Sequence, residues 1–234
     1  MVRVWKRMMD AQVDRMHLAL MLALTFSTGV IDAVGYLGLD KVFAGNMTGN
    51  VVILGMALVG AEGLPIIGPV LALVGFMIGA AIGGFFLRTS EPGWNRRTTG
   101  LFGVVGLIMT VLAVILFVTE DDLPRALALT ITGFLGGAMG LQAATARFIG
   151  VKDVTTVVVT STITGLAADS RLAGGDGKSS LKRATAVAAI LAGGAAGAGL
   201  LQWHLGAGLI LAAVITIVVA LLGSIHTKRI PDQP

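Results

Sequence analysis

The sequence predicts an all-α membrane protein with six transmembrane helices and two re-entrant half-helices, arranged as an inverted 3+3 repeat. Of its 234 residues, 55% are hydrophobic and only 13% are charged, about half of the roughly 25% that is usual in soluble domains. The apolar residues form long runs, and the basic residues lie between these runs. The absence of cysteine excludes a disulfide scaffold and thiolate metal sites. We treat residues 1–234 as one polytopic membrane domain.

Six apolar runs are long enough to cross a membrane, since a spanning helix needs about 20 residues. The first follows a basic N-terminal arm and is too long for the apolar region of a signal peptide, so we expect it to be retained. The last two are separated by one residue, so they must form a tight hairpin. The six runs are His17–Leu39, Pro65–Leu87, Thr99–Val118, Arg125–Ala146, Ala184–Trp203 and Leu205–Ile225.

Two further segments, Val42–Gly60 and Val154–Ser170, are apolar only in their second half. Each begins with a polar stretch that contains threonine, at Asn46–Asn50 in the first segment and at Thr155–Thr162 in the second. A segment that is this polar at one end is unsuited to form a helix that faces lipid. We therefore expect each segment to enter the membrane as a half-helix and to leave on the side from which it came.

The positions of the basic residues support this topology. With re-entrant segments and a cytoplasmic N-terminus, only Lys41 and Arg125 of the 17 basic residues lie outside, a division of 15 to 2. If both segments crossed fully, the division would fall to 11 to 6. Because cytoplasmic loops are enriched in lysine and arginine, we expect both termini in the cytoplasm.

The two halves of the chain, about 16–118 and 125–226, resemble each other. The stretch 47–50 aligns with 159–162, and 29–33 aligns loosely with 140–144. The glycine ladder at 75, 79 and 83 matches glycines at 193 and 197. Three crossings in each half place the second copy upside down relative to the first, an arrangement that recurs in secondary transporters. The glycines themselves indicate close helix packing, within the chain or across a homo-oligomer.

Two motifs carry a resemblance to a known family. The first comprises Gly29, Asp32, Ala33, Gly35, Tyr36, Leu37, Phe43 and Met47-Thr48-Gly49-Asn50, and the second comprises Gly140-Leu141-Gln142, Ala144, Thr155, Thr156 and Thr160. Together they resemble the signatures of the YoaK-like bacterial membrane proteins. The sequence departs from the family pattern at Ala143, where asparagine is usual, and at Ser161, where glycine is usual. The resemblance implies a polytopic inner-membrane protein and implies no substrate.

The polar stretches predict a binding site near the middle of the membrane. A half-helix over residues 50–60 is about 16 Å long, half of the membrane core, and would begin at the midplane. Two helix N-termini that face each other there carry partial positive charge and free N–H groups, which favours an anion or a solute rich in acceptors. Alternatively, Thr48 and Thr160 only cap buried half-helices. The candidate binding residues are Asn46, Thr48, Gly49, Asn50, Gln142, Thr160, Ser161 and Thr162.

Asp32 is the one acidic residue well inside a regular span. Intramembrane carboxyl groups are costly and usually functional, and burial lets such a group keep its proton near neutral pH. We expect Asp32 to couple transport to protons. The alternative is a structural role, in which Asp32 forms hydrogen bonds to the broken backbone around Asn46.

We therefore predict a secondary transporter of a small solute, proton-coupled through Asp32 and selective for an anion. The alternative is a channel-like or structural membrane protein without a transport cycle. No nucleophile and base are arranged for catalysis, so we predict no enzyme, and the three separated histidines predict no metal site. Apart from the lipid bilayer and the solute, no cofactor and no nucleic-acid partner is expected.

Overall fold

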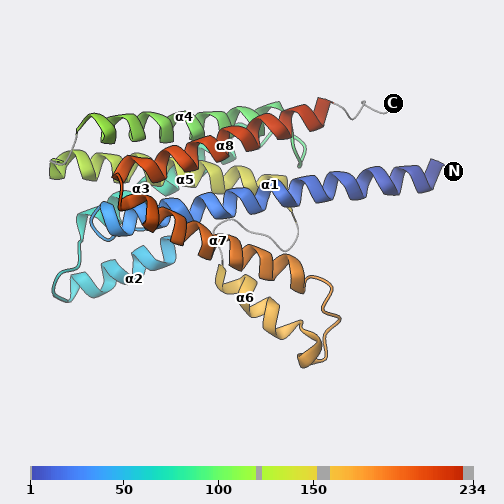
Figure 1. Ribbon diagram of the computed structural model, residues 1–234, viewed down its shortest axis with the longest axis horizontal. Coiled ribbons are helices and arrows are strands. Elements are labelled where there is room, and N and C mark those ends of the chain that lie inside the picture. The colour runs from blue at the N-terminus through green and yellow to red at the C-terminus, as the bar shows by residue number, and fades with distance from the viewer. Residues whose placement is uncertain (1, 120–122, 152–158, 229–234) are drawn as a thin grey trace.

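The computed structural model describes residues 2–119, 123–151 and 159–228, with side chains between 15 and 225 of these ranges. In these ranges the regular structure is entirely helical (Figure 1). The elements in chain order are α1 (Val2–Gly38), α2 (Met47–Leu58), α3 (Ile67–Leu87), α4 (Arg96–Val118), α5 (Arg125–Ile149), α6 (Val159–Ala168), the 3₁₀ helix η1 (Arg171–Ala173), α7 (Ser180–Leu201) and α8 (Leu205–Lys228).

The six predicted spans are confirmed, since six helices are long and apolar enough to cross a membrane. Most helix bounds lie within a few residues of the predicted ones. The exception is α1, which begins at Val2 and extends beyond the bundle, while its apolar span covers Arg15–Gly38. The chain is a multi-pass membrane protein.

The bundle has two ends with different contents (Figure 1). The start of α1, the end of α8, the loop 88–95 and the loop 169–179 lie at one end, whereas residues 59–66 and 202–204 lie at the other. Accordingly α1 and α2 both end at the second end of the bundle. The helices α5, which ends at Ile149, and α6 both end at the first end. The two short helices run toward opposite ends of the bundle, as expected of re-entrant half-helices.

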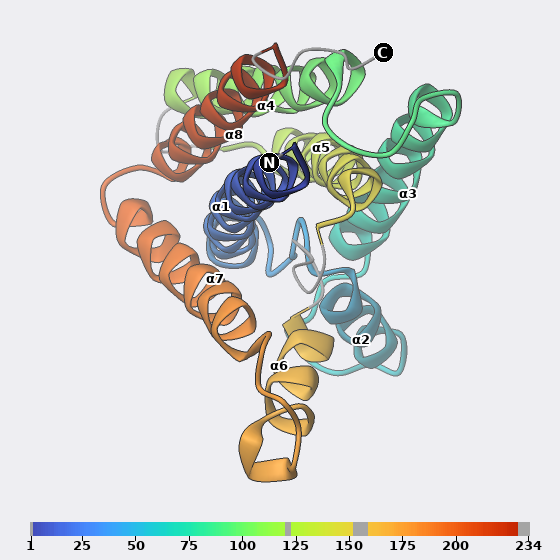
Figure 2. The same ribbon diagram turned by 90° about the vertical axis from the view of Figure 1, so that its right-hand side faces the viewer.

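The main hydrophobic core lies between α1, α4, α5 and α8. Val34 of α1, Met109 of α4, Leu135 of α5 and Leu209 of α8 are fully buried there. In the end view of Figure 2, α1 and α5 lie at the centre and α4 and α8 cover one side, while α7 lies beyond α1 and α3 lies beyond α5. The half-helices lie outermost, α2 against α3 and α6 against α7.

Glycine allows the flanking helices to approach the central ones closely. A Cβ atom at Gly193 of α7 would collide with the carbonyl oxygen of Phe26 on α1, and one at Gly79 of α3 would collide with that of Gly137 on α5. Such contacts are typical of small-residue helix packing in membranes. The predicted packing role of these glycines is confirmed, and here it operates within a single chain.

The same pattern continues along both helix pairs. Gly29 of α1 lies against the carbonyl of Ile190 on α7, and Gly140 of α5 lies against the carbonyl of Phe76 on α3. For these contacts, adding 111 to the residue number on α1 gives the corresponding residue on α5. Subtracting 114 from the residue number on α7 gives the corresponding residue on α3. Each half of the chain thus packs its second long helix, α3 or α7, in the same register against the first long helix of the other half.

Candidate functional site

The segment between α1 and α2 turns back along the helix that precedes it. Asp40 and Lys41 adopt positive φ angles of 82° and 57°, values that are uncommon outside glycine and that reverse the chain here. The N–H of Val42 then donates to the carbonyl of Gly35 at 3.4 Å. From Val42 onward the chain descends beside α1, which brings the start of α2 into the bundle.

The side chain of Asp32 forms hydrogen bonds with this segment. Its Oδ1 accepts hydrogen bonds from the N–H of Gly45 at 2.7 Å and from that of Asn46 at 3.3 Å. Because Asp32 lies six residues before Gly38, the end of α1, this junction is about 9 Å of helical rise from that end. The half-helix therefore begins between the midpoint and the end of the span, shallower than the predicted midplane position.

The capping residue of α2 is Asn46, and the prediction that Thr48 caps this helix is wrong. The Asn46 side chain accepts from the N–H of Gly49 at 3.2 Å, and the helix begins at Met47. Thr48 lies inside the first turn with an exposed side chain. Asparagine is among the best N-cap residues because its side-chain oxygen reaches free N–H groups of the first turn.

Asn50 fastens the loop to the half-helix. Its Oδ1 accepts from the N–H of Phe43 at 2.9 Å, and its Nδ2 donates to the carbonyl of Phe43 at 2.6 Å. The side chain is fully buried. Gly49 leaves room for the Phe43 ring, because a Cβ there would lie 2.7 Å from the ring. The sequence identified both residues as candidate ligands, but their described contacts hold the backbone in place.

Replacing Asn50 with alanine is expected to lower the free energy of unfolding by about 1 to 3 kcal/mol, since it leaves two partly buried backbone groups of Phe43 without these partners. Asn50→Asp, which keeps the acceptor and loses the donor, should fall between alanine and the native chain. The measurement is equilibrium unfolding in mixed micelles with increasing SDS. Thr48→Ala serves as the control and should change stability by less than about 0.5 kcal/mol. An equal loss in both alanine variants would contradict this role.

Gln142 adds a buried amide beside this junction. Its Nε2 approaches Thr28 Oγ1 at 3.5 Å, while its Oε1 is buried without a hydrogen-bond partner among the described residues. The Thr28 side chain also faces Gly45, lying 2.8 Å from the position of a Cβ there. We call Thr28, Asp32, Gly45 and Gln142 the polar junction. A buried unpartnered oxygen is costly, so this acceptor is the atom of the junction most in need of a donor.

The polar residues of α6 are not joined to the polar junction. Thr160 and Ser161 are exposed and Thr162 is buried, and within the described ranges α6 makes no contact with α2. Its contacts are with α7, whose Arg183 donates to the carbonyl of Gly165 and to Asp169, both at 2.6 Å. Thr155 and Thr156 lie outside the described residues.

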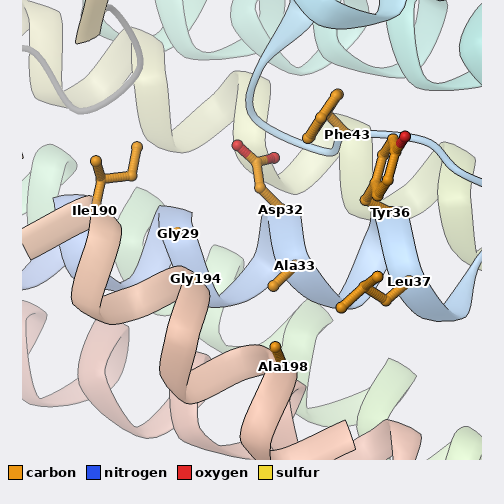
Figure 3. Close-up of a pocket in the computed structure, with 9 residues that line it drawn as sticks. All are labelled: Gly29, Asp32, Ala33, Tyr36, Leu37, Phe43, Ile190, Gly194 and Ala198. Atoms are coloured by element: carbon orange, nitrogen blue, oxygen red, sulfur yellow. The ribbon is translucent and has the colours of Figure 1, made fainter.

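A cavity of about 310 Å³ opens beside Asp32, between α1 and α7. Figure 3 shows Asp32, Tyr36 and Phe43 on one side of α1 and the small residues of α7 on the other. The sequence motifs contain Tyr36 and Phe43 but did not indicate that these side chains line a site. The lining residues are Gly29, Asp32, Ala33, Tyr36, Leu37, Phe43, Ile190, Gly194 and Ala198.

Comparison with known proteins agrees with this architecture. Residues 20–222 match the model of the family described as Protein of unknown function (DUF1275). The chain belongs to this family. It is also 30% identical, over 162 residues, to the UPF0700 transmembrane protein YoaK of Bacillus subtilis (strain 168), a match that covers 69% of each chain. The resemblance to YoaK-like proteins is thereby confirmed. No solved structure matches the chain.

Proposed function

We propose that this protein is a secondary transporter of a small solute, with its site at the polar junction and the adjoining cavity and with no catalytic role. The observation that carries the proposal is the position of Asp32. Its carboxyl group lies within a span, receives the backbone at the start of a broken helix and lines a cavity. Ionisable groups within membrane helices commonly mark solute or proton pathways, and discontinuous helices form the sites of many transporters.

We also propose that the two halves form an inverted repeat, which several helix contacts support. Under the exchange of residues 16–118 with 125–226, the contact of α1 with α7 corresponds to that of α5 with α3, and the contact of α2 with α3 corresponds to that of α6 with α7. The opposite directions of α2 and α6 fit the same relation. Two inverted halves of this kind can rock against each other and open a central site to either side in turn.

Proton coupling is proposed at Asp32. Of the described side chains that line the cavity, the one other titratable group is the phenol of Tyr36, one turn further along α1. Residues 44–46 present backbone to the carboxylate, α7 contributes Ile190, Gly194 and Ala198, and α5 contributes neutral side chains. Among the described residues no basic side chain lines the cavity with this carboxyl group, and in such surroundings it can exchange a proton as the cavity opens and closes.

The location of the basic residues also favours a particular orientation. The end of the bundle that holds the start of α1 and the end of α8 also holds Arg88, Arg97, Arg171 and Lys178. By the positive-inside rule we propose that this end faces the cytoplasm and that the protein resides in the bacterial inner membrane. We propose no oligomer through the glycine ladder, because its glycines are already occupied by contacts within the chain.

The native protein should link the movement of a solute to the movement of protons across the membrane. Proteoliposomes that enclose the pH dye pyranine receive benzyltrimethylammonium, choline or benzenesulfonate from outside. We expect at least one probe to change the internal pH faster than in empty liposomes. If no probe changes the internal pH at either of two external pH values, the transporter is contradicted and the structural alternative remains. Rapid uptake without any proton movement would indicate the channel-like alternative.

A further inference from the structure

The charge at the polar junction differs from what two helix N-termini alone would produce. The N–H groups of Gly45 and Asn46 donate to Asp32, and the N–H of Gly49 donates to the Asn46 side chain. The positive end of α2 is therefore already matched by an anion that belongs to the protein itself. A second anion at this position would be repelled by the carboxylate, and the reason for expecting an anionic solute here is removed.

The cavity beside Asp32 has no basic side chain to balance this carboxylate. Its described lining contains neither lysine, arginine nor histidine. The described ion pairs lie far along the chain, at Asp176 with Lys178 and at Asp169 with Arg183. A carboxylate in a site of low dielectric is stable when it is protonated or paired with a cation. Within the part of the chain that the structure describes, the cavity thus offers a negative group without a cationic partner.

The rest of the cavity suits an apolar cation. The rings of Tyr36 and Phe43 stack with their centroids 4.9 Å apart and an angle of 22° between planes, and both line the cavity with the carboxylate beside them. Aromatic faces attract cations through their quadrupoles, most strongly for weakly hydrated ions such as quaternary ammonium. Ala33, Ile190 and Ala198 supply aliphatic surface for the body of such a ligand.

We infer that the solute is a small organic cation, an amine or quaternary ammonium ion with an apolar body, which pairs with Asp32 and rests against Tyr36 and Phe43. This inference rests on the proposed function and names its substrate class. The volume of about 310 Å³ is at the lower bound for small-molecule sites, which limits the solute to a compact molecule. A proton and this cation would compete for one carboxylate, which makes their exchange obligatory.

Binding to the purified full-length protein tests the inference without any need for transport. The probes are benzyltrimethylammonium, the pair of choline and its uncharged isostere 3,3-dimethylbutan-1-ol, and benzenesulfonate, with affinity measured by calorimetry. We expect benzyltrimethylammonium to bind the native chain, choline to bind at least tenfold more tightly than its isostere, and benzenesulfonate not to bind. Equal affinity for choline and the isostere, or preference for benzenesulfonate, would overturn the inference.

Variants then locate the bound cation. Asp32→Asn, whose amide oxygen can still accept from Gly45 and Asn46, should weaken benzyltrimethylammonium binding at least tenfold, and Tyr36→Leu several-fold. Asp40→Asn removes an exposed carboxylate from the same loop and should leave the affinity unchanged. Unchanged affinity in Asp32→Asn would overturn the inference. If Asp32→Asn does not fold, the comparison of choline with its isostere on the native chain still decides.

The two proposals fail separately. Cation binding without proton-linked uptake into liposomes would overturn the transporter and keep the site. Proton-linked uptake of benzenesulfonate without cation binding would keep the transporter and overturn the substrate class.

Discussion

Replacing Gly79 with valine is expected to separate α3 from α5 and to lower the free energy of unfolding by about 3 kcal/mol, the upper part of the range for overpacked interiors. The reason is that the new side chain would meet backbone atoms, the carbonyl group of Gly137 and the N–H of Leu141, which cannot rotate away. Unfolding of the purified protein in mixed micelles with increasing SDS measures the change.

The matched control for this substitution is Gly84→Val on the same helix. Gly84 is exposed and has no atom within 4 Å of a Cβ placed there, so the side chain would point away from the packed face. We expect stability equal to or slightly above that of the native chain, since glycine in a helix costs about 0.5–1 kcal/mol relative to alanine. Equal destabilisation at the two positions would show that loss of glycine itself, and not helix contact, is responsible.

Asp32→Asn is expected to lower proton-linked solute movement at least tenfold while leaving the fold intact. Asparagine has nearly the same shape, and its oxygen can accept from the N–H groups of Gly45 and Asn46, but the side chain cannot bind or release a proton near neutral pH. The measurement uses proteoliposomes that contain pyranine and whichever of benzyltrimethylammonium, choline or benzenesulfonate the native chain moves.

Two comparisons make the result for Asp32 specific. Asp40→Asn should transport like the native chain, because Asp40 lies on the exposed turn after α1. Asp32→Ala should lose stability as well as transport, because it leaves two backbone N–H groups without their acceptor. Full transport by Asp32→Asn, with proton dependence retained, would rule out coupling at this group and leave the capping of the loop as its role.

The spans were predictable because hydrophobicity and length determine which segments cross a membrane. The re-entrant segments were recognisable for a related reason, since Asn46 and Asn50 bring polar groups that lipid cannot satisfy. Arg88, Arg97 and the other basic residues predict which side of the membrane each loop faces, and this stays a prediction. Composition therefore suffices for the spans and the interruptions between them.

The individual hydrogen bonds of the junction were not predictable in the same way. Asn46, Thr48 and Asn50 are all capable of capping a helix or binding a solute, and one residue of shift in the helix start exchanges their roles. The observed start at Met47 makes Asn46 the cap, exposes Thr48 and buries Asn50 against Phe43. The internal alignment of the two halves also led us to expect residues 159–162 and 47–50 at one site. In the described residues, however, α6 contacts α7 and not α2.

By itself, the sequence determined that this is a six-span membrane protein with two polar interruptions and that Asp32 is an unusual group within a span. Those conclusions depend on free energies of transfer, which are properties of each segment alone. Only the tertiary structure decided that Asp32 receives the backbone of Gly45 and Asn46 and that a cavity opens beside it toward α7. The α7 residues of the cavity lie far from Asp32 in sequence, and Gly45 and Asn46 reach it only because the loop after α1 folds back. These contacts therefore depend on how the helices pack, and that packing decides the charge that a bound solute would meet.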